Sequence, residues 1–394
     1  MSRALAHVEI VNNKQPIEGA DRIELITVLG WNVIQQKDTV HVGDKVVYIE
    51  IDSKVPATEA FEFLEKRGYK VKSIRMRGQI SQGLVMTFEQ LGLNPDKYEV
   101  GDDLTEKLGI TKIETDEEKR LKSSESFDSA IMSMKARHKN FFSRPLIKKM
   151  MKWTWFRKLM FFFLGRKKDK PKSFPGFIKK TDETRVENIP NVLGQKKHYI
   201  RTEKIDGTSS TYAIRKTSGL FGGANFEFIV CSRNVRQQDV DQKCYHDCGN
   251  VYWEMFYKYN IGDFLKKMQE STGAEIVILQ GETYGESLQG NPYKLDHREF
   301  RGFNLILTDS RNSFYTRYPS NAAKDLCARD GIMWVPILDE IYELPDNMKD
   351  MKETAEGKSV VNPDVLREGI VYRCPEDDSS FKNVSNSYLL KHNG

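Results

Sequence analysis

Residues 197–214 read KHYIRTEKIDGTSSTYAI, and this stretch decides how the second half of the chain is interpreted. Ile205 lies between Lys204 and Asp206, and successive side chains of a strand point to opposite faces. We therefore expect a strand in which the lysine and the carboxylate share one pocket while Ile205 enters the core. Gly207 allows the chain to bend and to approach a ligand closely.

A lysine in such a pocket is a candidate nucleophile. Its ordinary pKa of about 10.4 leaves it protonated at neutral pH, so it needs burial or cationic neighbours to lose its proton. A metal ion held by Asp206 would provide such a neighbour. For an isolated K-x-D-G the alternative is a surface ion pair between Lys204 and a carboxylate.

The region from residue 173 to the end alternates strand-like runs with longer polar or helical segments. This pattern predicts an α+β domain with a mostly antiparallel sheet. The strand-like runs after KHYIRTEKIDGTSSTYAI are FEFIVCSRN, AEIVILQGETYG, FRGFNLILTDS, REGIVYRC and SSFKNVSNSYLLK.

Residues 1–110 alternate short apolar runs with turn signals, which predicts the strands of a small OB-like barrel. Val40 and Val42 precede Gly43-Asp44 and an apolar run follows, which is a hairpin signal. Basic residues gather in the same region. They belong either to a solvated strand or to an RNA-binding groove that follows the phosphate backbone. The candidates for RNA contacts are Lys70, Lys72, Arg75 and Arg77.

Residues 111–172 change to a helical, charged character and end in a basic, aromatic segment that we interpret as a linker. Its apolar run LMFFFLG is too short to span a bilayer. It forms either an amphipathic helix packed on a neighbouring domain or an interfacial helix, and packing is the commoner case.

Composition bounds the class of protein. The chain has 394 residues, 30% of them charged, which predicts a globular protein of two or three domains. The net charge of +5 is small, so a nucleic-acid surface must be local. No targeting or membrane-spanning segment is visible, so we expect no membrane partner. The five cysteines are too few for a disulfide framework, which favours a reducing, intracellular compartment, cytoplasmic or nuclear.

Further motifs follow Lys204 in a fixed order. They are Ser232-Arg233-Asn234, Gly281-Glu282, Phe300-Arg301-Gly302-Phe303, Glu368-Gly369 and the pair Lys382 and Lys391. The series resembles the ordered nucleotidyltransferase motifs of the covalent ligase and capping-enzyme superfamily. In DNA ligases and capping enzymes an OB domain follows the last motif. Here only His392, Asn393 and Gly394 follow, which we expect to exclude both.

The segment at residues 174–188, FPGFIKKTDETRVEN, and the barrel placed in front resemble the Naegleria-type RNA ligases, relatives of the Deinococcus and T4 RNA ligase 2 groups. The resemblance implies an OB-like RNA-binding domain at 1–110, a helical linker at 111–172 and a nucleotidyltransferase domain at 173–394 of the ATP-grasp-like covalent ligase kind. It also implies an ATP-dependent ligase acting on nicked or broken RNA, as in RNA repair, with magnesium or manganese and no obligatory protein partner.

The roles that the resemblance implies are assigned residue by residue. Lys204 would attack the ATP α-phosphate, Phe303 would stack on adenine, and Glu203 and Gly207 would help to hold the nucleotide. Lys382 and Lys391 would meet the α-phosphate or pyrophosphate, and Arg233 and Asn234 the ribose or the RNA end. The metal candidates are Asp206, Glu282 and Glu368, of which Glu282 would also contact the nucleotide.

Three other interpretations have weaker support in the sequence. Cys244, His246 and Cys248 have the spacing of metal ligands, but no second pair nearby would complete a zinc site. The glycine-rich stretch at 219–223 lacks the Lys-Ser/Thr of a phosphate loop and fits a hairpin turn. A non-catalytic RNA-end-binding protein with a relic nucleotidyltransferase domain would carry damaged motifs, and the motifs here are intact.

Overall fold

The computed structural model describes residues 4–113, 139–160 except 143, 152, 154 and 158, then 172–218, 224–240, 242 and 249–392. Three expectations fall largely or wholly outside these ranges: the turn at 219–223, the cysteine cluster at 244–248 and the segment at 120–172. The domain boundaries expected near 110 and 172 therefore stay predictions. No helix of the described residues is long and apolar enough to cross a membrane.

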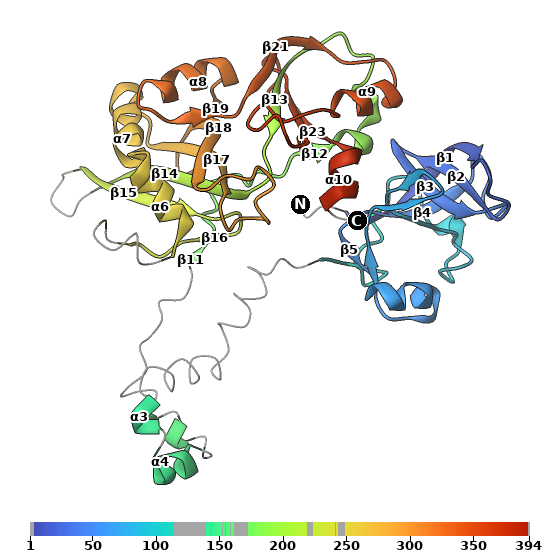
Figure 1. The fold of residues 1–394 in the computed structure, drawn as a ribbon, viewed down its shortest axis with the longest axis horizontal. Coiled ribbons are helices and arrows are strands. Elements are labelled where there is room, and N and C mark those ends of the chain that lie inside the picture. Colours follow the sequence, from blue (N-terminus) through green and yellow to red (C-terminus); the bar gives the residue numbers. More distant parts are fainter. Residues whose placement is uncertain are drawn as a thin grey trace.

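The N-terminal strands form a nearly closed antiparallel barrel (Figure 1). The strand order is β3-β2-β1-β4-β9. The open ends of this order meet because the Gln82 amide donates to the Asn32 carbonyl at 2.8 Å and the Ile34 amide to Ser81 Oγ at 2.9 Å. The strands are β1 (Ala6–Pro16), β2 (Ile23–Val28), β3 (Trp31–Gln36), β4 (Lys45–Ile49) and β9 (Leu84–Met86). The barrel that the short apolar runs predict is thus present.

The hairpin expected through Gly43-Asp44 is wrong. Residues 37–44 form no strand, and β4 pairs with β1 instead, with Ala6 opposite Ile49. The local turn signal is real, but the apolar run after it is buried best between β1 and β9, at long sequence separation. Val40 is buried without a strand, while Val42 stays exposed.

A small sheet extends the barrel toward the second domain. Its order is β10-β5-β6, from β10 (Thr111–Lys112), β5 (Ser53–Lys54) and β6 (Lys70–Val71). A separate hairpin follows, β7 (Ile74–Met76) with β8 (Gln79–Ser81), whose two-residue turn is Arg77-Gly78, both with positive φ. Between β5 and β6 a 3-10 segment, Glu59–Arg67, buries Phe61 and Leu64 against the barrel.

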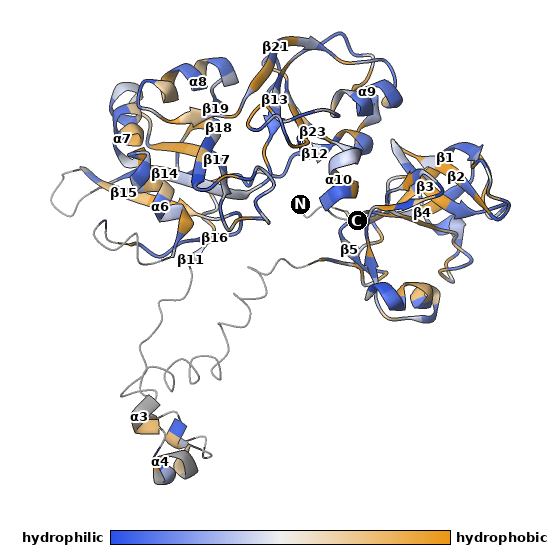
Figure 2. Cartoon of the chain, in the orientation of Figure 1, coloured by the Kyte–Doolittle hydropathy of each residue, from blue (hydrophilic) through white to orange (hydrophobic). Residues whose placement is uncertain are grey.

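Two sheets build the larger part of the chain after residue 172. The large sheet has the order β11-β16-β15-β14-β17-β18-β19, with β20 beside β18, and the smaller one the order β12-β23-β22-β13-β21. In Figure 2 apolar residues follow the strands of the large sheet and of the barrel. The large sheet comprises β11 (Lys172–Ser173), β14 (Thr208–Ser218), β15 (Ala224–Cys231), β16 (Val235–Arg236), β17 (Ile276–Gly285), β18 (Arg298–Thr308), β19 (Tyr315–Arg317) and β20 (Met333–Trp334). The smaller sheet comprises β12 (Thr184–Arg185), β13 (His198–Lys204), β21 (Ile337–Glu343), β22 (Gly369–Arg373) and β23 (Ser380–Val384).

Helices α6 (Val251–Lys258), α7 (Ile261–Thr272) and α8 (Ser320–Ala328) cover one face of the large sheet. Helix α7 places Ile261, Phe264, Leu265 and Met268 on one buried stripe, the i, i+3, i+4, i+7 pattern of an amphipathic helix, and ends at Gly273 in the left-handed conformation. Helix α9 (Met348–Thr354) packs on the smaller sheet, and helix α10 (Asn386–His392) follows β23. Helices α3 (Lys139–Phe142) and α4 (Pro145–Met150) share a small apolar cluster of their own.

The barrel docks on the second domain through β3 and the residues after β12. The Gly30 amide donates to the Glu187 carbonyl at 2.9 Å, and the Trp31 indole donates to the Asn188 side chain. The Asn188 amide in turn donates to Glu50 at 2.6 Å. A side chain at Gly30 has no room, since its Cβ would lie 2.8 Å from the Glu187 Cα of the backbone. The two domains therefore meet through specific, close contacts.

Glu50 also joins this junction to a buried histidine. His7 Nδ1 lies 2.7 Å from Glu9 and its Nε2 lies 3.5 Å from Glu50, with the ring edge-on to Tyr48. Burial alone would lower the pKa of His7, but the hydrogen bonds and charges of Glu50 and Glu9 raise it to about 9.

We expect protonated His7 to stabilise the barrel in a pH-dependent way. Because its folded-state pKa of about 9 exceeds the unfolded value of about 6.5, the stabilisation is complete below about pH 6.5 and is lost as pH rises through about 9. The shift corresponds to about 3 kcal/mol. Melting curves of wild type and His7→Gln should differ most at about pH 6 and converge by about pH 10. His41→Gln, at an exposed histidine, is the control. A difference that does not change with pH would contradict this role.

Candidate functional site

Lys204 ends β13 and faces a carboxylate across the sheet. The register places Lys204 opposite Gly369, so Glu368, the residue before β22, lies directly beside it. Lys204 Nζ lies 2.6 Å from Glu368 Oε2, with 26% and 15% of the two side chains exposed. Lys204 lines a cavity of about 900 Å³, and Glu368 contacts that lysine. Lys204 thus forms an ion pair, but in a cavity rather than on an open surface.

The turn after Lys204 is held tightly in place. Ile205 is buried in the core of the large domain, as the alternating pattern predicts. The Asp206 amide is hydrogen-bonded to Tyr293 Oη at 2.9 Å, and its carboxylate accepts a hydrogen bond from Tyr388 of α10 at 2.7 Å. Gly207 approaches β17 so closely that a Cβ would lie 2.4 Å from the Thr283 carbonyl oxygen. Close approach, and not a positive φ, is what requires glycine here.

Negative charge surrounds Lys204. Glu282 lies on β17 and lines the cavity, and together with Glu368 it holds the pKa of Lys204 above its ordinary value although burial would lower it. Burial first, and then the charges of Glu368 and Asp206, raise the pKa of Glu282 to about 8. Burial and Glu368 likewise raise the pKa of Asp206. Carboxylates crowded in this way fit a bound cation.

The three metal candidates do not form a compact cage. Among the described residues, no group of three or more His, Cys, Asp or Glu side chains is gathered closely enough to hold a metal ion. Magnesium commonly keeps several waters and takes only one or two carboxylates directly. The arrangement of Asp206, Glu282 and Glu368 therefore suits a hydrated ion better than a site closed by protein ligands.

Phe303 reaches the cavity because of a β-bulge in β18. Gln280 pairs with Asn304 and Gly281 with Gly302, which leaves Phe303 as the extra residue. A bulge redirects the side chain at that position. Phe303 lines the cavity, whereas Phe300 is fully buried in the core. Of the two aromatic residues in this motif, the structure thus places Phe303, the candidate for stacking on adenine, at the cavity.

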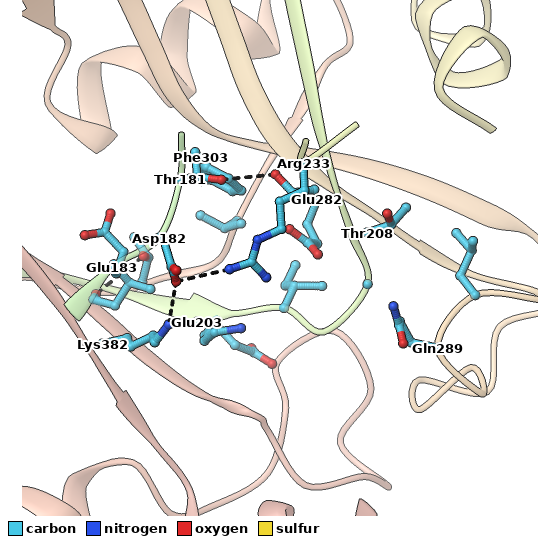
Figure 3. A pocket seen from close by; sticks show the side chains of 18 of the residues that line it. Thr181, Asp182, Glu183, Glu203, Thr208, Arg233, Glu282, Gln289, Phe303 and Lys382 are labelled. Carbon is cyan, nitrogen blue, oxygen red and sulfur yellow. Dashed lines mark hydrogen bonds and ion pairs between the residues drawn. The ribbon is translucent and has the colours of Figure 1, made fainter. Parts of the chain in front are cut away.

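Two cations contact one carboxylate in the cavity, as Figure 3 shows for Asp182. Asp182, in the segment before β12, forms ion pairs with Lys382 of β23 at 3.2 Å and with Arg233 at 3.1 Å, both through Oδ1. Burial, with the nearby cations Lys204 and Arg185, lowers the pKa of Lys382 to about 8 despite the opposing effect of Asp182. Lys382 and Arg233 therefore share a single carboxylate, Asp182.

Arg373 is a site residue that the motif comparison did not assign. It is buried on β22, donates to the Phe303 carbonyl and lies 3.5 Å from Glu183. Burial lowers its pKa to about 10. Strand alternation from Gly369 through Val371 would have indicated that it faces the cavity. Asp182 and Tyr388 lie within quoted segments, but no spacing rule singles them out.

Three further residues that the sequence suggested for the site have different surroundings from one another. Lys391 is exposed on α10, where Tyr388 is the residue that reaches Asp206. Glu203 lines the cavity, but its buried carboxylate accepts from the Val360 amide at 2.8 Å. Asn234 also lines the cavity and accepts from Lys180 at 3.0 Å.

The four basic candidates of the barrel region do not act as one group. Lys70, Arg75 and Arg77 are exposed on β6 and on the β7–β8 hairpin. Lys72 is exposed too, but it lines the cavity that holds Lys204. Of the four residues, the structure thus brings Lys72 to the cavity.

Comparisons with known proteins agree with this geometry. Residues 5–88 match the model of an OB-fold domain, which confirms the OB-like barrel. Residues 197–389 match the RNA ligase model. No curated protein sequence matches significantly. The fold and the lysine-centred cavity thus define a nucleotidyltransferase of the ligase class. The match to the RNA ligase family covers residues 197–389, the part of the chain that contains Lys204 and Glu368.

Solved structures of one relative resemble the chain over its whole length. Naegleria gruberi RNA ligase with pyrophosphate is 27% identical, with a TM-score of 0.72 and coverage of 100% of this chain and 99% of that one. A variant of the same ligase with AMP and manganese is 27% identical at TM-score 0.72, and one with ATP and manganese is 28% identical at TM-score 0.73. In both cases 99% of each chain is covered.

The close approach at Gly207 predicts the effect of one added methyl group. In Gly207→Ala the new Cβ would collide with the backbone of β17, which cannot move without breaking the sheet. We expect the rate of ATP-dependent labelling of the protein to fall at least about tenfold, since a displacement of about 1 Å at a reacting group costs more than that. Gly176→Ala, with no atom within 4 Å of the new Cβ, is the control. Equal labelling by both variants would show that the approach has no functional role.

Proposed function

We propose that the protein is an ATP-dependent RNA ligase that joins 3′-hydroxyl and 5′-phosphate RNA ends through AMP bound covalently to Lys204. The observation that carries the proposal is the largely buried ion pair of Lys204 with Glu368, in which the lysine lines the same cavity as Phe303, Arg233 and Lys382. The family match and the ATP, AMP and pyrophosphate complexes of the Naegleria ligase support the same nucleotide.

In the first step the neutral Lys204 amine attacks the α-phosphorus of ATP. A nitrogen–phosphorus bond forms, the bond to the bridging oxygen breaks, and pyrophosphate leaves. Adenine would stack on Phe303, whose ring the bulge presents to the cavity. Lys382 and Arg233 would bind the phosphates and release Asp182 from its present contacts.

Two further displacements complete the reaction. An oxygen of the RNA 5′-phosphate attacks the AMP phosphorus, which frees the Lys204 amine and forms a phosphoanhydride, AppRNA. The 3′-hydroxyl then attacks the RNA phosphorus, so a phosphodiester forms and AMP leaves. Both steps build charge on phosphoryl oxygens, which fixed cations stabilise.

We assign the metal ion, magnesium or manganese, to Asp206, Glu282 and Glu368, partly through water. When bound, it would neutralise phosphoryl oxygens and compensate the carboxylates around Lys204. In its absence those carboxylates favour the protonated lysine, which cannot attack. The chain's own part is to hold Lys204 at the end of a rigid strand in line with the α-phosphate.

The first test is the covalent intermediate. Wild-type protein incubated with α-labelled ATP and magnesium should retain label after denaturation, and Lys204→Ala should not. Lys391→Ala serves as a comparison, because Lys391 is exposed outside the cavity lining and its loss should reduce the label less than Lys382→Ala does. A wild type without label, or a labelled Lys204→Ala, would refute the proposal.

The second test is the nucleic acid. Nicked duplexes with RNA on the 3′-hydroxyl side should be sealed faster than all-DNA nicks of the same sequence, because a site for RNA contacts the 2′-hydroxyl. Sealing can be followed as extension of a labelled strand on denaturing gels. Equal rates on both substrates would reject RNA as the preferred substrate.

A further inference from the structure

Asp206 is held by two tyrosines from distant parts of the chain. Tyr293 Oη accepts from the Asp206 amide at 2.9 Å, and Tyr388 Oη of α10 donates to Asp206 Oδ2 at 2.7 Å. Both tyrosines are buried, so packing limits the movement of their rings. The position of the Asp206 carboxylate therefore depends on the elements that hold Tyr293 and Tyr388.

Glu356, which follows α9, holds the start of the helix that carries Tyr388. Its Oε1 accepts from the Asn386 amide at 2.8 Å, and its Oε2 accepts from Ser385 Oγ at 2.8 Å. The Tyr388 amide donates to the same Ser385 Oγ at 3.0 Å. A carboxylate that accepts from the first amides of a helix satisfies donors that have no partner within the helix. Glu356 thus fixes the turn from which Tyr388 reaches Asp206.

The loop that begins at Glu356 also holds the second tyrosine. Residues 356–367 close on themselves, because the Arg367 guanidinium donates to the Glu356 carbonyl at 2.9 Å. Within this loop Asn362 Nδ2 donates to the Tyr293 carbonyl at 2.8 Å. The loop therefore supports the aspartate from two sides, through its amide and through its carboxylate.

Glu356 does not line the cavity itself. Its two carboxylate oxygens already accept from Asn386 and Ser385, so they are occupied within the protein. An effect of Glu356 on the site must therefore pass through α10 and Tyr388.

From these contacts we infer that Glu356 is a positioning residue, which acts through Tyr388 on the Asp206 carboxylate. The Tyr388 hydroxyl occupies Oδ2 and so sets the orientation in which Asp206 presents its other oxygen. Hydrogen bonds behind a metal-binding carboxylate orient it and strengthen the binding of the ion. The inference rests on the proposed function and deepens it, because Asp206 is one of the residues to which we assign the metal ion.

The test compares Tyr388→Phe and Glu356→Gln with the control Glu353→Gln. The first change removes only a hydroxyl group, and the second removes the charge that holds the start of α10. Glu353 is an exposed glutamate of α9, so its replacement removes the same charge without these contacts. Calorimetry measures ATP affinity in a Lys204→Ala background, where no turnover occurs, once with manganese and once with EDTA. The ratio of the two affinities is the gain that the metal ion provides.

We expect Tyr388→Phe to reduce this metal-dependent gain about tenfold, the scale on which partners behind a metal ligand act. The affinity measured in EDTA should change far less. Glu356→Gln should reduce the gain in the same direction. The double variant should lose no more than Tyr388→Phe alone, because both residues act on one carboxylate. Glu353→Gln should match the protein without it.

An unchanged metal-dependent gain in Tyr388→Phe, or additive losses in the double variant, would overturn the inference. An equal loss in Glu353→Gln would do the same. If melting curves show that Glu356→Gln unfolds, Tyr388→Phe alone decides. Failure of the proposed function would look different, since wild type would then carry no AMP on Lys204. The calorimetric measurement needs no turnover and would still report the metal-dependent gain.

Discussion

The ion pair between Lys204 and Glu368 is the contact on which the site depends. It requires β13 and β22 to pair with Lys204 opposite Gly369, and it requires the chain to turn away at once through Gly207. Glu282 of β17 and Lys382 of β23, on strands of two different sheets, line the same cavity as Lys204. The cavity lies where these sheets meet, so the register of β13 decides both the fold there and the chemistry.

The local features of the site could be predicted from the sequence. Alternation around Ile205 placed Lys204 toward a pocket, and the order of the later motifs indicated which strands would line it. The small barrel also followed from its short apolar runs. The prediction of a hairpin at Gly43-Asp44 was wrong, because β4 is buried better when it pairs with β1 across a long sequence separation. Turn signals report local conformation and cannot report which distant strand is the partner.

The tertiary contacts of the site could not be predicted from sequence patterns. The bulge that directs Phe303 into the cavity depends on one unpaired residue between two strands. Asp182 contacts Lys382 and Arg233 from a segment without regular structure, and Arg373 donates to the Phe303 carbonyl. Lys72 looked like one of several basic surface residues. Its position on the cavity follows from the docking of the barrel, which involves Trp31, Asn188 and Glu50. Sequence spacing within either domain contains no information about that contact.

The most direct measurement is peptide mass spectrometry of the protein after incubation with ATP and magnesium, followed by removal of free nucleotide. The account predicts the mass of one AMP on the peptide that contains Lys204, lost on addition of pyrophosphate, which reverses the first displacement. AMP on a different lysine, or no adduct on any peptide of a folded protein that binds ATP, would contradict it.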